Sequence, residues 1–416
     1  MVRITDIVEQ LPEMMFGDEL LTALAVIPEY DDDIVNKSAA ERLRRLSDLY
    51  KLYIPSVMSQ EIYGKFYLAL VRSLEKKGTR LAIEQRNENH KIIRQQDYSA
   101  VIGGADSFTI IGNSGIGKSS AISRVVSLIA EKRVIEIDRP YTKIIPCLIV
   151  QCPFDSSVKN FICSALMEID SCLGSNYYVN AMKGRPSTDT LLSTLSQVAI
   201  SHIGLLIIDE VQNMAHSKNG KNLVGALTQL INSSGISICM VGTPECTVFF
   251  EQAMQLARRS LGLQYSAMEY GDEFIEFCKI ALRYQYVKNR AEITEGIIQY
   301  LYEHSGGNVS AVISLIHDAQ EIAIISTKET LDIEMLNEAY QKRLAFLHGY
   351  LKPIKTRRSQ TSTIKRNKEI VAFDVGIETV TQNEYSIGEL VAKAKEEDLD
   401  IVKLLKENIA VEEVPV

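Results

Sequence analysis

A glycine-rich stretch between an apolar run and an amphipathic segment is the feature that most constrains the fold of this 416-residue chain. It comprises Gly112, Asn113, Ser114, Gly115, Ile116, Gly117, Lys118 and Ser119, which match the P-loop pattern of glycine, four residues, glycine, lysine and serine. Glycines let a backbone turn tightly without a side chain that blocks an anion, and the N-terminus of the following helix attracts phosphate. With Ser120, the stretch predicts a site for ATP.

A second element lies further along the chain, where the apolar residues 205–208 end in Asp209 and Glu210. Together with the P-loop, this pattern resembles a Walker B strand. In such a pair, Lys118 reaches the β- and γ-phosphates, and Ser119 and Asp209 hold Mg²⁺. Glu210 would polarise the attacking water, because phosphoryl transfer depends on positioning and charge stabilisation. An adjacent glutamate favours hydrolysis over transfer to a second substrate.

Polar and basic residues follow the last expected strand. Its tip, Gly242-Thr243-Pro244, resembles the sensor position of AAA+ ATPases, where Thr243 would contact the γ-phosphate and the water. An ordinary turn is the alternative. Arg258 and Arg259 resemble the arginine finger that such ATPases insert into a neighbouring subunit's site, with a solvated helix end as the alternative. No arginine closely follows the loop 305–310, which puts nucleotide sensing by this region in doubt.

The rhythm of apolar residues predicts the fold class. From Ser107 onward, short apolar runs alternate with amphipathic stretches, which is typical of a parallel sheet with crossover helices. We expect strands over 107–111, 145–151, 205–209 and 236–242. We expect helices over 38–53, 59–77, 80–96, 118–131, 158–172, 187–201 and 221–233. The predicted class is α/β: an AAA+ P-loop NTPase core of parallel strands with flanking helices, a helical N-terminal region and a C-terminal helical lid.

The same patterns suggest a domain organisation. We expect a helical, partner-binding N-terminal region over 1–100, an ATPase core over 101–271 and a lid over 272–350. Residues 351–368 are rich in Lys and Arg with Ser, Thr and Gln, which predicts a basic linker. Residues 369–416 form an acid-rich tail.

Composition excludes several classes. Hydrophobic residues make up 46% and charged residues 24%, so most of the chain should fold. The longest apolar runs fall short of the roughly 18 to 20 residues that span a bilayer, and no secretory signal is evident, so we expect no membrane contact and a cytoplasmic setting. Seven cysteines without a CxxC pair predict reduced thiols. The net charge of −8 excludes a uniformly basic surface but leaves room for a local one.

Finer similarity narrows the family. It is carried by residues 172–177, 204–212 with their Ile-Ile-Asp-Glu-Val-Gln, 241–244 and 257–259, and by the N-terminal residues 16–24 and 54–55. Together they resemble the TnsC branch of the TnsC/TniB transposition regulators. The resemblance implies an ATP-dependent, DNA-binding homo-oligomer that forms rings or filaments on duplex DNA. It would couple a target-selection protein, TnsD/TniQ-like, to the transposase subunits, with ATP hydrolysis as a timer or disassembly switch.

Contacts with DNA are harder to place than contacts with ATP. The candidates for contact with DNA are Lys159, Lys183, Arg185, Lys218 and Lys221. The alternative for each is an ordinary solvated side chain on the surface with no role in binding. Three other functions stay open: a helicase or initiator loader of the AAA+ class, a signalling ATPase that binds no DNA, and a scaffold in which ATP is structural.

Overall fold

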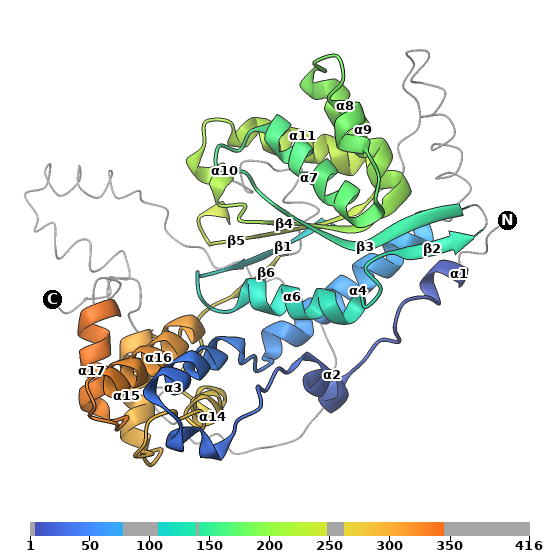
Figure 1. Ribbon diagram of the computed structural model, residues 1–416. Helices are drawn as coiled ribbons and strands as arrows, with labels where there is room; N and C mark the ends of the chain where they lie inside the picture. The colour runs from blue at the N-terminus through green and yellow to red at the C-terminus, as the bar shows by residue number, and fades with distance from the viewer. Residues whose placement is uncertain (1–4, 78–106, 139–140, 248–261, 345–416) are drawn as a thin grey trace, which may run out of the picture. The chain divides into compact units, whose positions relative to one another are not determined.

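The computed structural model describes residues 5–77, 107–138, 141–247 and 262–344 (Figure 1). All of them belong to the first of the two units into which the chain divides, Met1–Lys355 and Thr356–Val416. Several predictions fall outside the described residues: the helix over 80–96, the basic linker, the acidic tail, and Arg258 with Arg259. Among the described residues, no helix combines the length and apolar character needed to cross a membrane.

A six-stranded sheet forms the centre of the core (Figure 1). Its strands are β1 (Ser107–Gly112), β2 (Ile135–Asp138), β3 (Tyr141–Gln151), β4 (Ile203–Asp209), β5 (Ser237–Gly242) and β6 (Leu263–Tyr265). They lie in the order β2-β3-β4-β5-β1-β6, and only β2 runs antiparallel to its neighbour. The four predicted strands are confirmed, whereas β2 and β6 were not predicted, since both are short. Strand β5 thus lies between the P-loop strand and the Asp-Glu strand.

Helices cover both faces of this sheet, as expected for parallel strands. One face packs against α7 (Val158–Leu173), α9 (Thr188–His202) and α11 (Gly220–Ser234), and the other against α6 (Lys118–Ile129) and α4 (Val57–Lys77). Alternation along the strands explains this arrangement. On β4, the side chains of Leu206 and Ile208 belong to the hydrophobic cluster with α7, α9 and α11, while those of Leu205 and Ile207 belong to the cluster with α4 and α6.

The N-terminal helices are shared between the core and the lid. Helix α2 (Gly17–Leu24) contacts α6, since Arg124 donates to the carbonyl oxygens of Ala23 at 3.2 Å and Leu24 at 3.0 Å. Helix α4 packs on the sheet, where Phe66 meets the ring of Phe108 with centroids 5.8 Å apart. Between them, α3 (Ala39–Leu46) and the 3-10 segment η2 (Ser47–Lys51) pack on the lid. The segment 25–56 therefore leaves the core, reaches the lid and returns.

The lid is a helical cluster around α16 (Val309–Ile325). Its other elements are α14 (Asp272–Ala281), α15 (Glu295–Ser305), α17 (Ile333–Ala339) and the π-helical turn η3 (Tyr340–Leu344). Shorter helices complete the described chain: α1 (Thr5–Val8), η1 (Asp32–Asn36), α8 (Tyr177–Ala181) and α10 (Asn213–His216). The helical character predicted for residues beyond 272 is confirmed over the described part of that range.

A buried ion pair fastens α3 to the lid. The guanidinium of Arg42 donates to both carboxylate oxygens of Glu329 at 2.6 Å each and to the carbonyl oxygen of Tyr286 at 2.9 Å. The side chain of Arg42 is 1% exposed and that of Glu329 is 14% exposed. The hydrogen bonds from Arg42 lower the pKa of Glu329 below its ordinary value of 4.5. A carboxylate with a lowered pKa stabilises the folded state above its ordinary pKa, and this contribution is lost as the pH falls through the folded-state pKa.

We predict that Glu329→Gln lowers the free energy of unfolding at pH 7 by about 3–5 kcal/mol, because Arg42 is left as a buried charge without its partner. The difference from the wild type should shrink as the pH falls, because Glu329 of the wild type is protonated first in the unfolded state and then, through its lowered pKa, in the folded state. Urea unfolding at pH 7 and at pH 3 measures both values. Glu334→Gln, which removes the exposed partner of Lys328, is the control and should change little. An equal effect of Glu329→Gln at both pH values would contradict the assignment.

Candidate functional site

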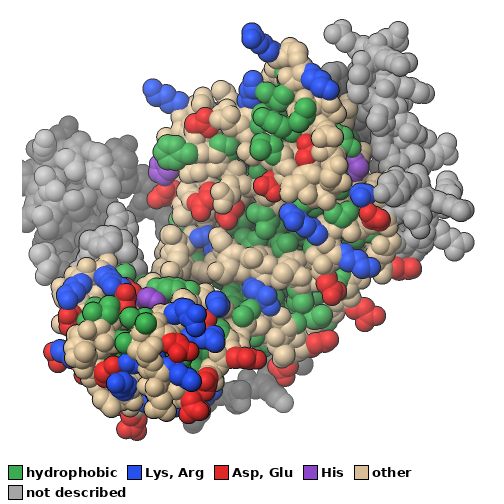
Figure 2. Space-filling model, in the orientation of Figure 1, with side chains coloured by type: hydrophobic (Ala, Val, Ile, Leu, Met, Phe, Trp, Pro, Cys, Tyr) green, Lys and Arg blue, Asp and Glu red, His purple; other side chains and the backbone are tan. Residues whose placement is uncertain are grey.

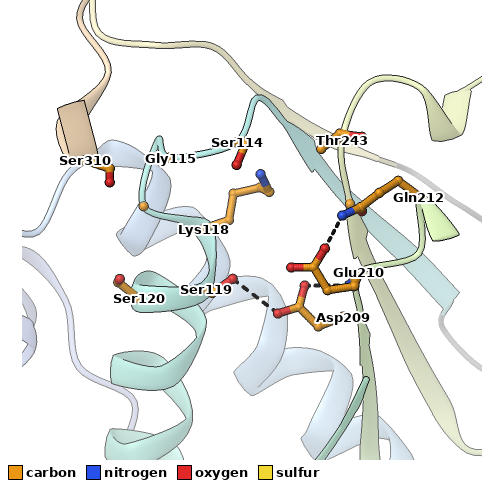
Figure 3. A pocket seen from close by; sticks show the side chains of 12 residues that line it. Ser114, Gly115, Lys118, Ser119, Ser120, Asp209, Glu210, Gln212, Thr243 and Ser310 are labelled. Atoms are coloured by element: carbon orange, nitrogen blue, oxygen red, sulfur yellow. Dashed lines mark hydrogen bonds between the residues drawn. The ribbon is translucent and has the colours of Figure 1, made fainter. Parts of the chain in front are cut away.

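A pocket of about 210 Å³ opens at the carboxyl ends of β1, β4 and β5 (Figure 3). Its lining comprises Ser114, Gly115, Gly117, Lys118, Ser119, Ser120, Asp209, Glu210, Gln212, Gly242, Thr243 and Ser310. The register brings these residues together, since Ile111 of β1 pairs with Gly242 of β5, and Ile208 of β4 pairs with Met240 of β5. Parallel strands end at one edge, so three separate segments deliver their polar residues to a single pocket.

The loop after β1 requires its glycines. Gly115 and Gly117 adopt φ angles of +81° and +99°, which residues with a side chain rarely adopt. A Cβ on Gly112 would lie 2.8 Å from the carbonyl oxygen of Tyr265. The loop is thus a narrow backbone cradle at the start of α6. Such a cradle presents amide groups to an anion, and the residues present fit a nucleotide phosphate.

Lys118 lies over this cradle. Its ammonium donates to the carbonyl oxygens of Gly112 at 2.6 Å and Asn113 at 2.8 Å. Burial lowers the pKa of Lys118, and the carboxylates of Asp209 and Glu210 act in the opposite direction. The result is a buried cation held beside two acidic groups, at a place where a phosphate could take over its hydrogen bonds.

Ser119 and Asp209 meet across the pocket (Figure 3). The Ser119 hydroxyl donates to Asp209 Oδ2 at 3.2 Å, although the two residues come from α6 and β4. A hydroxyl and a carboxylate oxygen are hard ligands of the kind that Mg²⁺ takes, usually with water and phosphate oxygens in its remaining positions. This pair could hold Mg²⁺ at the mouth of the cradle.

Glu210 is held in an unusual backbone conformation. Its φ angle is +59°, in the left-handed region, and its backbone N–H donates to Asp209 Oδ1 at 2.8 Å. The amide of Gln212 donates to the Glu210 carboxylate (Figure 3). Strained backbone at an acidic residue in a pocket is a recurrent property of active sites. Gln212 therefore fixes the direction of the Glu210 side chain.

Thr243 contributes a hydroxyl without a partner. Its Oγ1 atom is buried and makes no hydrogen bond, as is also true of Gln212 Oε1. A buried hydroxyl without a partner costs free energy, so a hydrogen-bond partner for this atom would stabilise the site. Thr243 lies on the pocket wall opposite the P-loop.

The structure brings most of the residues predicted for the site together. Ser114, Gly115, Gly117, Lys118, Ser119, Ser120, Asp209, Glu210 and Thr243 line the pocket. Gly112, Asn113 and Ile116 do not line it. The first two supply the carbonyl oxygens that bind Lys118, and Ile116 is 6% exposed within the loop. Arg258 and Arg259 lie outside the described residues.

Sequence reasoning missed three contributors. The sequence signal for Gln212 is its position two residues after Glu210, at the end of the same strand. Ser310 ends the loop 305–310, which in the sequence is distinguished only by the lack of a following arginine, yet it lines the pocket. Asn308 caps α16 and contacts the P-loop, and its signal was the Gly-Gly-Asn sequence before an apolar helix.

The candidate DNA contacts fall into two groups. Lys159 lies in the first turn of α7, and Lys218 and Lys221 flank the start of α11. These two segments are joined, because Ser217 and Asn219 both donate to the carbonyl oxygen of Asp155. Lys183 and Arg185 lie instead in the loop between α8 and α9. All five side chains are exposed, and Figure 2 shows Lys and Arg side chains dispersed over the face in view.

These features define a class of protein. A P-loop between β1 and α6, an acidic strand separated from β1 by one further strand, and a helical lid form the fold of an AAA+ P-loop NTPase. Residues 102–265 match the family described as bacterial TniB protein. The family resemblance inferred from the sequence is confirmed.

Other comparisons show more distant likeness. No curated protein matches the sequence. The Aeropyrum pernix ORC1 protein in complex with DNA is 14% identical, with a TM-score of 0.42, and the match covers 62% of this chain and 64% of that chain, less than two thirds of its length. Drosophila ORC bound to DNA is 12% identical, with a TM-score of 0.44 and coverage of 99% and 87%. Domain III of the Thermotoga maritima replication initiation protein DnaA is 13% identical, with a TM-score of 0.35 and coverage of 64% and 92%.

We predict that Thr243→Val raises the free energy of unfolding of the nucleotide-free protein by about 1 kcal/mol, because it removes a buried hydroxyl that has no partner. The same variant should gain less stability from a saturating nucleotide than the wild type does. Thermal unfolding with and without nucleotide measures both effects. Thr228→Val is the matched control: its hydroxyl donates to the carbonyl oxygen of Val224, so its loss should destabilise. A nucleotide-free Thr243→Val protein less stable than the wild type would count against an orphaned hydroxyl.

Proposed function

We propose that the protein is a Mg²⁺-dependent ATPase that regulates DNA transposition. The observation that carries the proposal is the convergence of the P-loop, the Ser119–Asp209 contact, Glu210 and Thr243 on one pocket. A site that only stored nucleotide would need the cradle and Lys118. It would not need a carboxylate oriented by Gln212 at the place where a water molecule would attack.

Each residue would contribute a separate part of hydrolysis. The ammonium of Lys118 would exchange the carbonyl oxygens of Gly112 and Asn113 for phosphate oxygens. When bound, Mg²⁺ supplies charge neutralisation on those oxygens, and Ser119 with Asp209 would hold it. Glu210 would orient the attacking water and accept its proton, and Thr243 would donate its hydroxyl to the γ-phosphate or the water.

The role in transposition is also part of the proposal, and the match of residues 102–265 to the TniB family supports it. Subunits would assemble into rings or filaments on duplex DNA in the cytoplasm, with Arg258 or Arg259 completing the site of a neighbouring subunit. The assembly would couple a TnsD/TniQ-like target-selection protein to the transposase subunits. Hydrolysis would then act as a timer or disassembly signal, because contacts made to the γ-phosphate are lost when it leaves.

Other parts of the chain would serve partners. Residues 1–100 would include surfaces for partner proteins, and the acidic residues 369–416 would dock a partner such as the transposase. Lys159, Lys218 and Lys221, on the two segments joined through Asp155, are the favoured DNA contacts. Lys183 and Arg185 would add a second contact region, and the basic residues 351–368 a non-specific one.

We predict that Glu210→Gln keeps ATP affinity but lowers the rate of hydrolysis by roughly 100-fold or more, because a positioned base contributes about that much. Lys118→Ala should lose ATP binding itself. Equilibrium binding and steady-state phosphate release separate the two effects. Glu245→Gln makes the same chemical change at an exposed carboxylate paired with His216, and it should hydrolyse ATP normally. Undiminished turnover in Glu210→Gln would remove the proposed mechanism, and no turnover in the wild type would leave a structural ATP scaffold.

We also predict that the protein forms ordered assemblies on duplex DNA with a non-hydrolysable ATP analogue, whereas Lys118→Ala does not. Electron microscopy tests assembly, and titration at several salt concentrations tests the contacts.

Affinity for DNA should fall by roughly 0.9 log unit per log unit of salt for each phosphate neutralised. Replacing Lys159, Lys218 and Lys221 together by alanine should reduce that slope, and Lys279→Ala on α14 should not. A salt-independent response, or ATP hydrolysis without DNA binding, would favour a signalling ATPase. Stimulation of helicase loading rather than insertion would favour a loader.

A further inference from the structure

Two hydrogen bonds join the lid to the P-loop. The side-chain amide of Asn308 donates to the carbonyl oxygen of Ser114 at 2.7 Å, and the backbone N–H of Ser310 donates to the carbonyl oxygen of Gly115 at 3.0 Å. We call these two contacts the lid latch. Both acceptors belong to the tip of the loop that cradles phosphate, and both donors belong to the first turn of α16 or its cap.

The latch is held rigidly from the lid side. Asn308 is also the N-cap of α16, because its Oδ1 accepts from the backbone N–H of Ala311 at 3.2 Å. The preceding Gly307 has a φ angle of +75°, and its carbonyl oxygen accepts from the backbone N–H of Met268 at 3.0 Å. A Cβ on Gly307 would lie 1.9 Å from the carbonyl oxygen of Met268. The cap is therefore fixed by its own helix and by the connector that joins core and lid.

The latch also determines where the loop's amides point. In a trans peptide unit, the carbonyl and the N–H point in opposite directions. Holding the carbonyl groups of Ser114 and Gly115 toward the lid therefore directs the N–H groups of Gly115 and Ile116 away from it. These belong to the amides through which a P-loop binds phosphate.

The close contact between Gly115 and Asn308 also indicates that the lid positions the loop. A Cβ on Gly115 would lie 2.6 Å from Asn308 Oδ1. A side chain on Gly115 would therefore displace the amide of Asn308, and the φ angle of +81° also favours glycine at this position. Ser310, which carries the second donor, lines the pocket as well. Lid and loop are in direct contact at the site itself.

We infer that Asn308 and Ser310 are positioning residues through which the lid sets the nucleotide affinity of the P-loop. The lid needs no arginine for this coupling, because it acts on the main chain of the loop rather than on the phosphate. By linkage, nucleotide binding stabilises the latched arrangement by the same factor by which the latch strengthens nucleotide binding. The inference rests on the proposed nucleotide-binding function and adds the route by which the lid takes part in it.

Asn308→Ser is the variant that isolates the latch. Serine caps helices about as well as asparagine and adds no charge near the phosphates, but it cannot extend an amide to Ser114. We expect about tenfold weaker binding of Mg-ADP and of a non-hydrolysable ATP analogue, within the usual range of coupling between sites. In the nucleotide-free full chain, the amide of Ser310 should exchange its hydrogen faster than in the wild type.

Two measurements protect this test from a folding defect. Thermal unfolding should show a nearly unchanged midpoint for Asn308→Ser, since the cap remains. Asp332→Ser exchanges the N-cap of α17, where Asp332 accepts from the N–H of Met335 at 2.9 Å, and it should leave nucleotide affinity unchanged.

The outcomes separate the inference from the proposed function. If the wild type binds nucleotide and Asn308→Ser binds it equally well, the latch has no role in affinity and the inference is overturned. If Asp332→Ser weakens binding as much as Asn308→Ser does, lid stability rather than the latch is responsible, which also overturns it. If the wild type binds no nucleotide, the proposed function falls and the inference falls with it.

Discussion

Parallel pairing of β1, β5 and β4 is the constraint on which the rest of the structure depends. Because these strands run in the same direction and in register, each ends at the same edge of the sheet. The residue types that follow them differ: a glycine loop and lysine after β1, two carboxylates at the end of β4, and a glycine–threonine turn after β5. None of these segments is a site alone. Burial of both faces of the sheet fixes their spacing and so creates the pocket.

The residues at that edge divide into those with satisfied hydrogen bonds and those without. Lys118, Ser119 and Glu210 have partners within the protein, which hold them in place. Thr243 Oγ1 and Gln212 Oε1 are buried without partners. The partnered groups are thus positioned in advance, while the orphaned atoms favour a ligand that would complete them. Preorganised polar groups of this kind lose little free energy to reorientation when a reaction proceeds.

Much of this arrangement could be predicted from the sequence, for reasons that differ by residue. The P-loop and the Asp-Glu strand are local patterns, and parallel pairing brings them together once the strands are identified. Strand β6 was missed because three residues carry no periodicity. Asn308 and Ser310 were missed as contributors because their contacts depend on where the lid lies, which no local pattern encodes. The helix expected over 38–53 is α3 followed by the 3-10 segment η2, since this stretch turns to follow the lid.

The path of the N-terminal segment has a mechanical consequence. Along its described residues, the chain passes between core and lid three times: after α2, before α4, and between β6 and α14. Arg124 fastens the first crossing to the helix that follows the P-loop, and Arg42 fastens the middle of the excursion to the lid. A body joined by one linker can swing and twist freely, whereas one joined at three separate points retains few degrees of freedom. Displacement of α6 would therefore be transmitted to the lid as a movement in a defined direction.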